Sequence, residues 1–150
     1  MSTQRVVLVT GGNKGIGKAI STAFAANGDA VIINFNKSRD VAKTVLEELL
    51  PGNTTISLEQ ADVSDYRQAK QMINNIVEKY GKIDIVVNNA GIVRDGFLML
   101  MSEKDWHDVI SINLNGVFNC SKAVSEPMIS QRSGVIINIA SLSGITGLPG

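Results

Sequence analysis

The chain has 150 residues, a length that suits a single domain with a substantial hydrophobic core. Its 14 basic and 14 acidic side chains balance, so nothing in its charge favours nucleic acid or an anionic membrane as a partner. Cys120 is the only cysteine and His107 the only histidine, which excludes an internal disulfide and argues against a metal site or a Ser-His-Asp triad. The first strand begins almost at once, without a signal-peptide pattern, and no apolar stretch could span a bilayer, so a cytoplasmic protein is expected.

Apolar strands alternate with helix-like segments along the chain. Val6–Val9 is typical of a fully buried strand, and apolar residues at helical spacing from Ile16 to Phe24 predict a helix that stops at Asn27-Gly28. Further strands are predicted at residues 30–35, 54–61, 83–87 and 135–140. Further helices are predicted to begin at Ser38, at Ser64 and in a capping box at 102–105, the first two ending at Pro51-Gly52 and Gly81.

This alternation predicts an α/β fold: a doubly wound (Rossmann) parallel sheet with helices on both faces and the strand order 3-2-1-4-5. The helix behind the capping box is expected to bury one apolar stripe, formed by Trp106, Val109, Ile110, Leu114, Val117 and Phe118. Ligands bind such sheets at the carboxyl ends of the strands, where the glycine-rich and polar segments of this chain also fall.

The turn after the first strand reads Thr10-Gly11-Gly12-Asn13-Lys14-Gly15-Ile16-Gly17. A strand, a glycine turn and a helix N-terminus predict an anion site, because free backbone N–H groups and the positive end of the helix dipole face the same point. Glycines allow a diphosphate to approach the backbone closely. The spacing Gly-x-x-x-Gly-x-Gly differs from the common Gly-x-Gly-x-x-Gly fingerprint, and by itself it also fits a glycine-rich turn without a ligand.

Two further segments follow strands, Asp62-Val63 after the third and Asn88-Asn89-Ala90-Gly91 after the fourth. Together with the glycine turn, and in this order, they resemble the short-chain dehydrogenase/reductase family over the whole chain. A closer match in residues 89–95, 98–99, 106 and 113–118 looks like the 3-oxoacyl-(acyl carrier protein) reductases and acetoacetyl-CoA reductases of that family. The resemblance implies a homotetramer that reduces a 3-oxoacyl thioester, on acyl carrier protein or CoA, with NADPH in fatty-acid or polyketide-type synthesis.

The resemblance also implies which residues bind NADP(H): Gly11, Asn13, Lys14, Gly15, Ile16, Gly17, Asn36, Asp62, Val63, Asn89, Ala90 and Gly91. NAD-binding sheets place a carboxylate about 20 residues past the glycine turn, on the ribose 2′-hydroxyl, but Phe35-Asn36-Lys37 stands there. Lys14 inside the turn then favours NADP, because an ammonium can meet a 2′-phosphate. Lys14 and Lys37 also fit ordinary surface charges.

Asp62 and the segment after the fourth strand each have two interpretations. By resemblance, Asp62 and the Val63 backbone contact the adenine, and residues 89–91 line the ribose side of the coenzyme. From the residues alone, Asp62 fits a carboxylate stabilised by the N-terminus of the next helix, and residues 88–91 fit a turn.

Asn113 and Ser141 are the candidate catalytic residues. Asn113 falls on the apolar stripe, where a buried amide needs partners, so it fits a core asparagine bonded to the backbone. By resemblance it is instead a catalytic asparagine that holds a helix kink and orders a water. Ser141 follows the fifth strand and by resemblance hydrogen-bonds the substrate carbonyl, with Ser143 in support, although it also fits a polar loop serine.

The family's Tyr-x-x-x-Lys proton donor does not appear after the fifth strand; Tyr66, with Lys70 four residues on, and Tyr80 lie on the third predicted helix, too early to replace it. By family spacing it would follow Gly150, so residues 1–150 are expected to be a Rossmann domain truncated at its C-terminal end. The alternatives are a nucleotide-binding fragment without turnover, or a reductase of another small carbonyl or alcohol. An open apolar edge at 135–137 favours the longer reductase.

Three basic residues are candidates for docking an acidic carrier protein: Arg94, Lys104 and Arg132. Scattered surface charge is the favoured explanation for them, because charges at the rim of an interface mostly tune the association rate.

Overall fold

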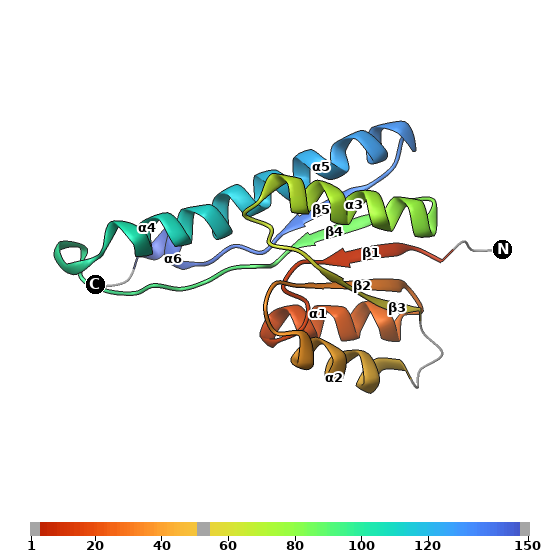
Figure 1. Cartoon of the computed structure of the whole chain (residues 1–150), viewed down its shortest axis with the longest axis horizontal. Coiled ribbons are helices and arrows are strands. Elements are labelled where there is room, and N and C mark those ends of the chain that lie inside the picture. The colour runs from red at the N-terminus through yellow and green to blue at the C-terminus, as the bar shows by residue number, and fades with distance from the viewer. Residues whose placement is uncertain (1–3, 51–54, 148–150) are drawn as a thin grey trace.

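The computed structural model describes residues 4–50 and 55–147, which form a five-stranded parallel sheet with the order β3-β2-β1-β4-β5 (Figure 1). The strands are β1 (Val6–Val9), β2 (Ala30–Phe35), β3 (Ile56–Gln60), β4 (Ile85–Asn88) and β5 (Val135–Asn138). The predicted α/β class and strand order are both confirmed. β1 and β2 have the predicted bounds, because strands buried on both faces are continuous apolar runs between turn residues.

Helices cover both faces of the sheet (Figure 1). α1 (Gly15–Ala26) and α2 (Arg39–Leu49) lie on one face, and α3 (Tyr66–Tyr80) and α5 (Gly116–Ser130) lie on the other. Beyond the carboxyl ends of the strands lie η2 (Leu98–Leu100), α4 (Glu103–Val109) and α6 (Ser143–Thr146), and the π-helical segment η3 (Ile110–Asn115) joins α4 to α5. None of the helices in the described ranges is long and apolar enough to cross a membrane.

The side chains of β1 alternate between two hydrophobic cores. Val6 and Leu8 pack with residues of α3 and α5, among them Met72, Ile73 and Val124. Val7 and Val9 pack with residues of α1 and α2, among them Ala25 and Val45. Each aliphatic side chain buried in this way contributes about 1.5–3 kcal/mol, so the central strands form a rigid support for the loops at their ends.

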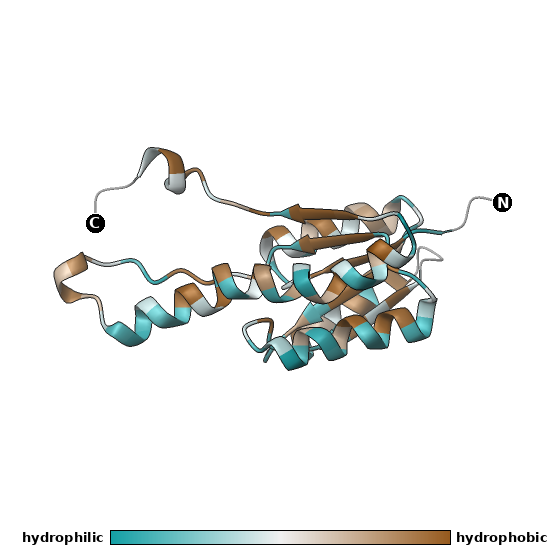
Figure 2. Cartoon of the chain, turned by 90° about the horizontal axis from the view of Figure 1, so that it is seen from above, coloured by the Kyte–Doolittle hydropathy of each residue, from teal (hydrophilic) through white to brown (hydrophobic). Residues whose placement is uncertain are grey.

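The apolar stripe expected from Trp106 to Phe118 is not buried. Trp106, Leu114 and Phe118 are 54%, 61% and 59% exposed, and α5 instead buries a set of later residues, Cys120, Ala123, Val124 and Met128. The exposure has two causes. α4, which carries Trp106, projects past the sheet (Figure 2). η3 has about one more residue in each turn than an α-helix, which rotates the residues after it, including Phe118, away from the expected face. β5 is also open, with Val135 52% exposed, as the sequence predicts for an edge.

The predicted helix ends are partly right. Gly81 ends α3 in the left-handed conformation (φ 75°), and Ser102 caps α4 by accepting from Asp105 N (3.0 Å). α3 begins at Tyr66 and not at Ser64, because the Asp62 carboxylate binds both the N–H and the hydroxyl of Ser64 and leaves Asp65 to cap the helix. Ser38 precedes α2, but its side chain makes no capping bond. The predicted stop at 51–52 lies outside the described residues.

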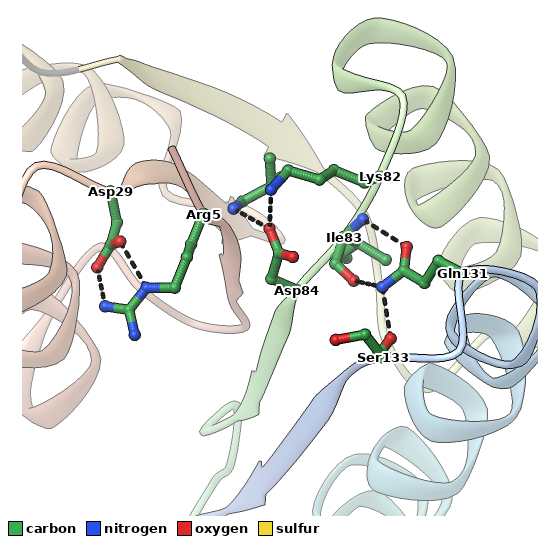
Figure 3. A network of polar contacts seen from close by, with 8 residues as sticks. Arg5, Asp29, Lys82, Ile83, Asp84, Gln131 and Ser133 are labelled. Carbon is green, nitrogen blue, oxygen red and sulfur yellow. Dashed lines mark hydrogen bonds and ion pairs between the residues drawn. The ribbon is translucent and has the colours of Figure 1, made fainter. Parts of the chain in front are cut away.

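The amino ends of the strands are joined by a polar network (Figure 3). Arg5 donates two hydrogen bonds to Asp29, at 2.8 and 2.7 Å, and holds the pKa of that carboxyl below its usual value. Asp84 accepts from the N–H of Val6 (2.7 Å) and pairs with Lys82 (2.9 Å). These contacts tie the starts of β1, β2 and β4 together, while the opposite ends of the strands carry the glycine turn and the polar loops.

Candidate functional site

A cavity of about 520 Å³ opens at the carboxyl ends of the strands, and we call it the carboxyl-end cavity. This volume lies within the range of small-molecule sites. Its walls come from the glycine turn, from the segments after β2, β3 and β4, and from α4 and η3: Gly11, Asn13, Lys14, residues 34–38, residues 61–64, residues 90–92, Arg94, Lys104, Asp108, Ser111 and Ile112. Loops distant in the sequence therefore meet at the edge where a doubly wound sheet binds ligands.

A second cavity, of about 560 Å³, lies on the α1 face beside β5. Its lining is mostly apolar, from Ile20, Phe24, Val87, Ile137 and Ile139, with Arg5 and Asn27 as the polar members. It lacks the set of convergent polar groups that orients a ligand, so the carboxyl-end cavity is the candidate site.

The glycine turn is shaped for close approach of a ligand. Gly11 has a φ of 59°, and a side chain at this position would also press on the Cα of Ala90 at 3.1 Å. A Cβ at Gly17 would collide with the carbonyl oxygen of Gly11 and with Asn89 Nδ2. The turn thus brings bare backbone to the N-terminus of α1, where the first amides have no partner within the helix.

Lys14 stands at the N-cap position of α1 in an extended conformation (φ −156°) and is exposed. It lines the carboxyl-end cavity together with Asn36 and Lys37, the residues that follow β2. Two cations therefore flank this end of the cavity, and the nearest residue past β2 is an amide, not a carboxylate.

Asn36 and Asp62 meet across the same end of the cavity. Asn36 Nδ2 donates to Asp62 Oδ2 (2.9 Å), and Asp62 Oδ1 accepts from Ser64 N (2.9 Å) and Ser64 Oγ (2.6 Å). Gln68 Oε1 accepts from the Asp62 N–H at 3.0 Å. The carboxylate is held from both sides, and Val63 beside it is buried.

Charged residues of α4 and its preceding loop face the cavity from the other side. Lys104 pairs with Asp108 and holds the pKa of that carboxyl below its usual value, and Arg94 lies 3.4 Å from Asp105. From the sequence, Arg94 and Lys104 are candidates for partner docking only, and Asp108 and Ser111 have no predicted role. Their position in the cavity wall follows from the path of the loop after β4, which has no local sequence signal.

Asn113 is exposed and not part of the core, which corrects the expectation from the apolar stripe. Its side chain pairs with the backbone of Ile92, accepting from Ile92 N and donating to Ile92 O, both at 2.9 Å. Asn113 lies in η3, and π-helical turns of this kind are frequent at functional sites. The pairing fixes the segment after Gly91 against the helix.

Ser141 lies three residues beyond β5 and is exposed. Its Oγ accepts a hydrogen bond from the backbone N–H of Ser143 (3.1 Å), so Ser143 contacts it through the main chain. Asn88 and Asn138 join the ends of β4 and β5 through a 2.9 Å side-chain bond, which positions the segments that lead to residues 89–91 and to Ser141.

Eight of the fourteen predicted site residues line the carboxyl-end cavity: Gly11, Asn13, Lys14, Asn36, Asp62, Val63, Ala90 and Gly91. Gly15, Ile16 and Gly17 form the adjoining start of α1, and Asn89 packs against the glycine turn. Asn113 touches the site through Ile92, whereas Ser141 stands on the neighbouring strand end and is not among the lining residues. No group of three or more His, Cys, Asp or Glu in the described part of the chain could hold a metal.

Comparison with known proteins gives a consistent result. A profile of the short chain dehydrogenase family matches residues 5–150. The 3-oxoacyl-(acyl-carrier-protein) reductase of Synechocystis sp. is 45% identical over 148 residues, which cover 99% of this chain and 60% of the relative. The corresponding reductase FabG of Staphylococcus aureus is 43% identical over 150 residues, which cover 100% of this chain and 61% of the relative.

A solved structure supports the same comparison. The crystal structure of gox2181 superimposes with a TM-score of 0.93 at 33% identity, covering 98% of this chain and 57% of that one. The chain thus spans about 60% of the length of the curated relatives it matches.

Proposed function

Because this chain belongs to the short-chain dehydrogenase family, we propose that its protein is an oxidoreductase that reduces 3-oxoacyl thioesters to 3-hydroxyacyl thioesters with NADPH. The relatives named above support acyl carrier protein as the thioester carrier, with CoA as the alternative carrier. The observation that carries the proposal is the carboxyl-end cavity, where a glycine turn, a helix N-terminus and the polar pair Asn36 and Asp62 meet.

The residues present fit a dinucleotide. The bare backbone at Gly11 and Gly17 leaves no room for a Cβ, and the adjoining N-terminus of α1 suits a diphosphate. We propose that the held Asp62 carboxylate and Val63 contact the adenine, and that residues 89–91 contact the ribose on the nicotinamide side. Lys14, with Asn36 and Lys37 nearby, favours a 2′-phosphate over a 2′-hydroxyl, and therefore NADP over NAD.

When bound, NADPH supplies the hydride. The role proposed for Ser141 is to donate its hydroxyl hydrogen to the substrate carbonyl oxygen, which polarises the carbonyl. Asn113 holds the loop at Ile92 through two backbone bonds and is proposed to order a water in a proton relay. The Tyr-x-x-x-Lys spacing occurs once in this sequence, at Tyr66 and Lys70, but on α3 and outside the lining of the carboxyl-end cavity. Tyr80, also on α3, bonds Ser57 Oγ through its Oη (3.0 Å).

The proposal is tested by titrating the full-length protein with NADPH and by following NADPH oxidation with acetoacetyl-CoA and with a 3-oxoacyl carrier protein. We expect saturable NADPH binding and thioester-dependent oxidation, and no turnover by residues 1–150 alone. NADPH binding without turnover of any carbonyl would favour the nucleotide-binding alternative. Absence of NADPH binding would overturn the assignment.

A further inference from the structure

Asn34 is a buried polar residue inside an otherwise apolar strand. It lies in β2 with 2% of its surface exposed, and its neighbours in the strand are aliphatic or aromatic. We propose that Asn34 is a positioning residue for the coenzyme: its amide fixes the glycine turn and the Asp62 segment relative to each other and so sets coenzyme affinity. The inference rests on the proposed function.

Asn34 binds the glycine turn through two hydrogen bonds. Its backbone oxygen accepts from Gly12 N at 3.0 Å, and its side-chain Oδ1 accepts from Gly11 N at 3.3 Å. Two consecutive amides of the turn are therefore satisfied by one residue. A diphosphate is left with the amides that follow, at the start of α1, and the left-handed conformation of Gly11 is held in place.

Asn34 also binds the end of β3 and the residue after it. Asn34 Nδ2 donates to Ala61 O at 3.0 Å and to Glu59 O at 3.3 Å. The register between β2 and β3 ends at the pair Phe35 and Gln60, so this amide reinforces the link just where the strands stop. Ala61 immediately precedes Asp62, which is proposed to contact the adenine.

The side-chain bonds to the two segments come from one rigid group, the Asn34 amide. An amide presents its oxygen and nitrogen at a fixed separation, and Asn34 uses the oxygen for the glycine turn and the nitrogen for the Asp62 segment. A coenzyme that spans both segments binds best when they are already in place, because preorganisation lowers the cost of ordering them. An apolar replacement leaves the Gly11 N–H and the Ala61 carbonyl without their partner, and both segments then shift to find another.

The alternative is a purely structural asparagine, and enzyme kinetics separate the two. A structural role lowers the amount of folded enzyme, so Vmax falls at an unchanged KM for NADPH. A positioning role raises the KM and Kd for NADPH while kcat at saturating NADPH stays close to the wild-type value.

The test compares Asn34→Leu with Asn75→Leu in the full-length protein, by calorimetric titration with NADPH and by NADPH oxidation with acetoacetyl-CoA. Asn75 is the matched control, because its amide also contacts β3, through Glu59 Oε2 at 3.3 Å, but lies on α3 away from both segments. We expect the Kd for NADPH to rise about tenfold in Asn34→Leu, the loss of roughly one good hydrogen bond, and to stay within about twofold in Asn75→Leu.

If Asn34→Leu does not fold, Asn34→Ser, which keeps a polar atom but reaches neither segment fully, carries the same comparison. A wild-type Kd in the folded Asn34 variant would overturn this inference alone, as would an equal rise in the Asn75 control. A wild-type protein that does not bind NADPH would overturn the proposed function and this inference together.

Discussion

Thr10 and Asn89 each hold the other's backbone. Thr10 Oγ1 accepts from Asn89 N at 2.9 Å, and Asn89 Nδ2 donates to Thr10 O, also at 2.9 Å. Thr10 Oγ1 further accepts from Ala90 N (3.0 Å) and donates to Val87 O (3.2 Å). Since Thr10 follows β1 and Asn89 follows the adjacent strand β4, this exchange locks the two loops that border the carboxyl-end cavity.

Replacing Thr10 by valine tests this lock. Valine has the same shape but no hydroxyl, so two partly buried backbone N–H groups lose their acceptor. We expect the free energy of unfolding in urea to fall by about 1–3 kcal/mol. The matched change Thr22→Val removes a hydroxyl that bonds Lys18 O on the exposed side of α1 and should cost less than about 0.5 kcal/mol. Equal losses in the two variants would contradict the lock.

Gly17 is the position where a side chain is least tolerated. A Cβ there would overlap the Gly11 carbonyl and Asn89 Nδ2, so Gly17→Ala must displace the glycine turn. We expect a loss of about 1–3 kcal/mol in unfolding free energy and a marked loss of NADPH affinity. Gly96→Ala is the control, because a Cβ at Gly96 meets nothing within 4 Å and should change neither quantity. NADPH affinity equal to wild type in Gly17→Ala would show that the turn is not the diphosphate site.

The sheet could be predicted from the sequence because parallel strands buried on both faces appear as apolar runs. The runs at 6–9 and 30–35 match β1 and β2 to the residue. The buried face of the helical segment from Trp106 to Phe118 could not be predicted in the same way, because helical spacing identifies an apolar stripe but not whether anything covers it. Trp106 and Phe118 are exposed since α4 leaves the sheet and η3 rotates the later turns.

Asn34 carries a signal in the sequence, because it is a single amide inside the apolar run at 30–35 and a buried amide must find partners. Its partners, Gly11 and Ala61, are 23 and 27 residues away, so only the strand order shows that they are neighbours. Arg94 in the irregular loop after β4, and Asp108 and Ser111 in the helical segments that follow it, line the cavity because of the path of that loop, which local spacing does not predict.

Lys14 provides a test of coenzyme choice. We expect Lys14→Ala to raise the KM for NADPH about tenfold or more, because a cation opposite the 2′-phosphate is removed, and to leave the KM for NADH nearly unchanged. Lys70→Ala on the exposed side of α3 is the control and should affect neither coenzyme. An equal rise in the KM for both coenzymes in Lys14→Ala would show that Lys14 does not bind the 2′-phosphate.

Cys120 should behave as an inert thiol in the folded protein. It is 1% exposed between α5 and the sheet, and burial raises its pKa to about 12, so almost no thiolate forms at neutral pH. We expect no reaction with a thiol-specific disulfide reagent in buffer and one equivalent of reaction in urea. Because reaction then reports unfolding, its midpoint in urea should agree with that from circular dichroism. Rapid labelling of the native protein would contradict the packing of α5.

The ion pair of Arg5 and Asp29 should make stability depend on pH in the acid range. The guanidinium hydrogen bonds lower the pKa of Asp29 in the folded protein, so the pair stabilises the fold above the unfolded pKa of about 3.9. That contribution is lost as the pH falls through the lower folded pKa, whereas Arg5 stays charged throughout.

Asp29→Asn should therefore cost about 1–3 kcal/mol at pH 7, since it weakens two charge-assisted bonds. The difference from wild type should shrink steadily below about pH 4. Asp95→Asn in the exposed loop after β4 is the control, and urea unfolding from pH 2 to pH 7 measures all three proteins. A difference between wild type and Asp29→Asn that does not change with pH would show that the carboxylate charge plays no part in holding β2 to the start of β1.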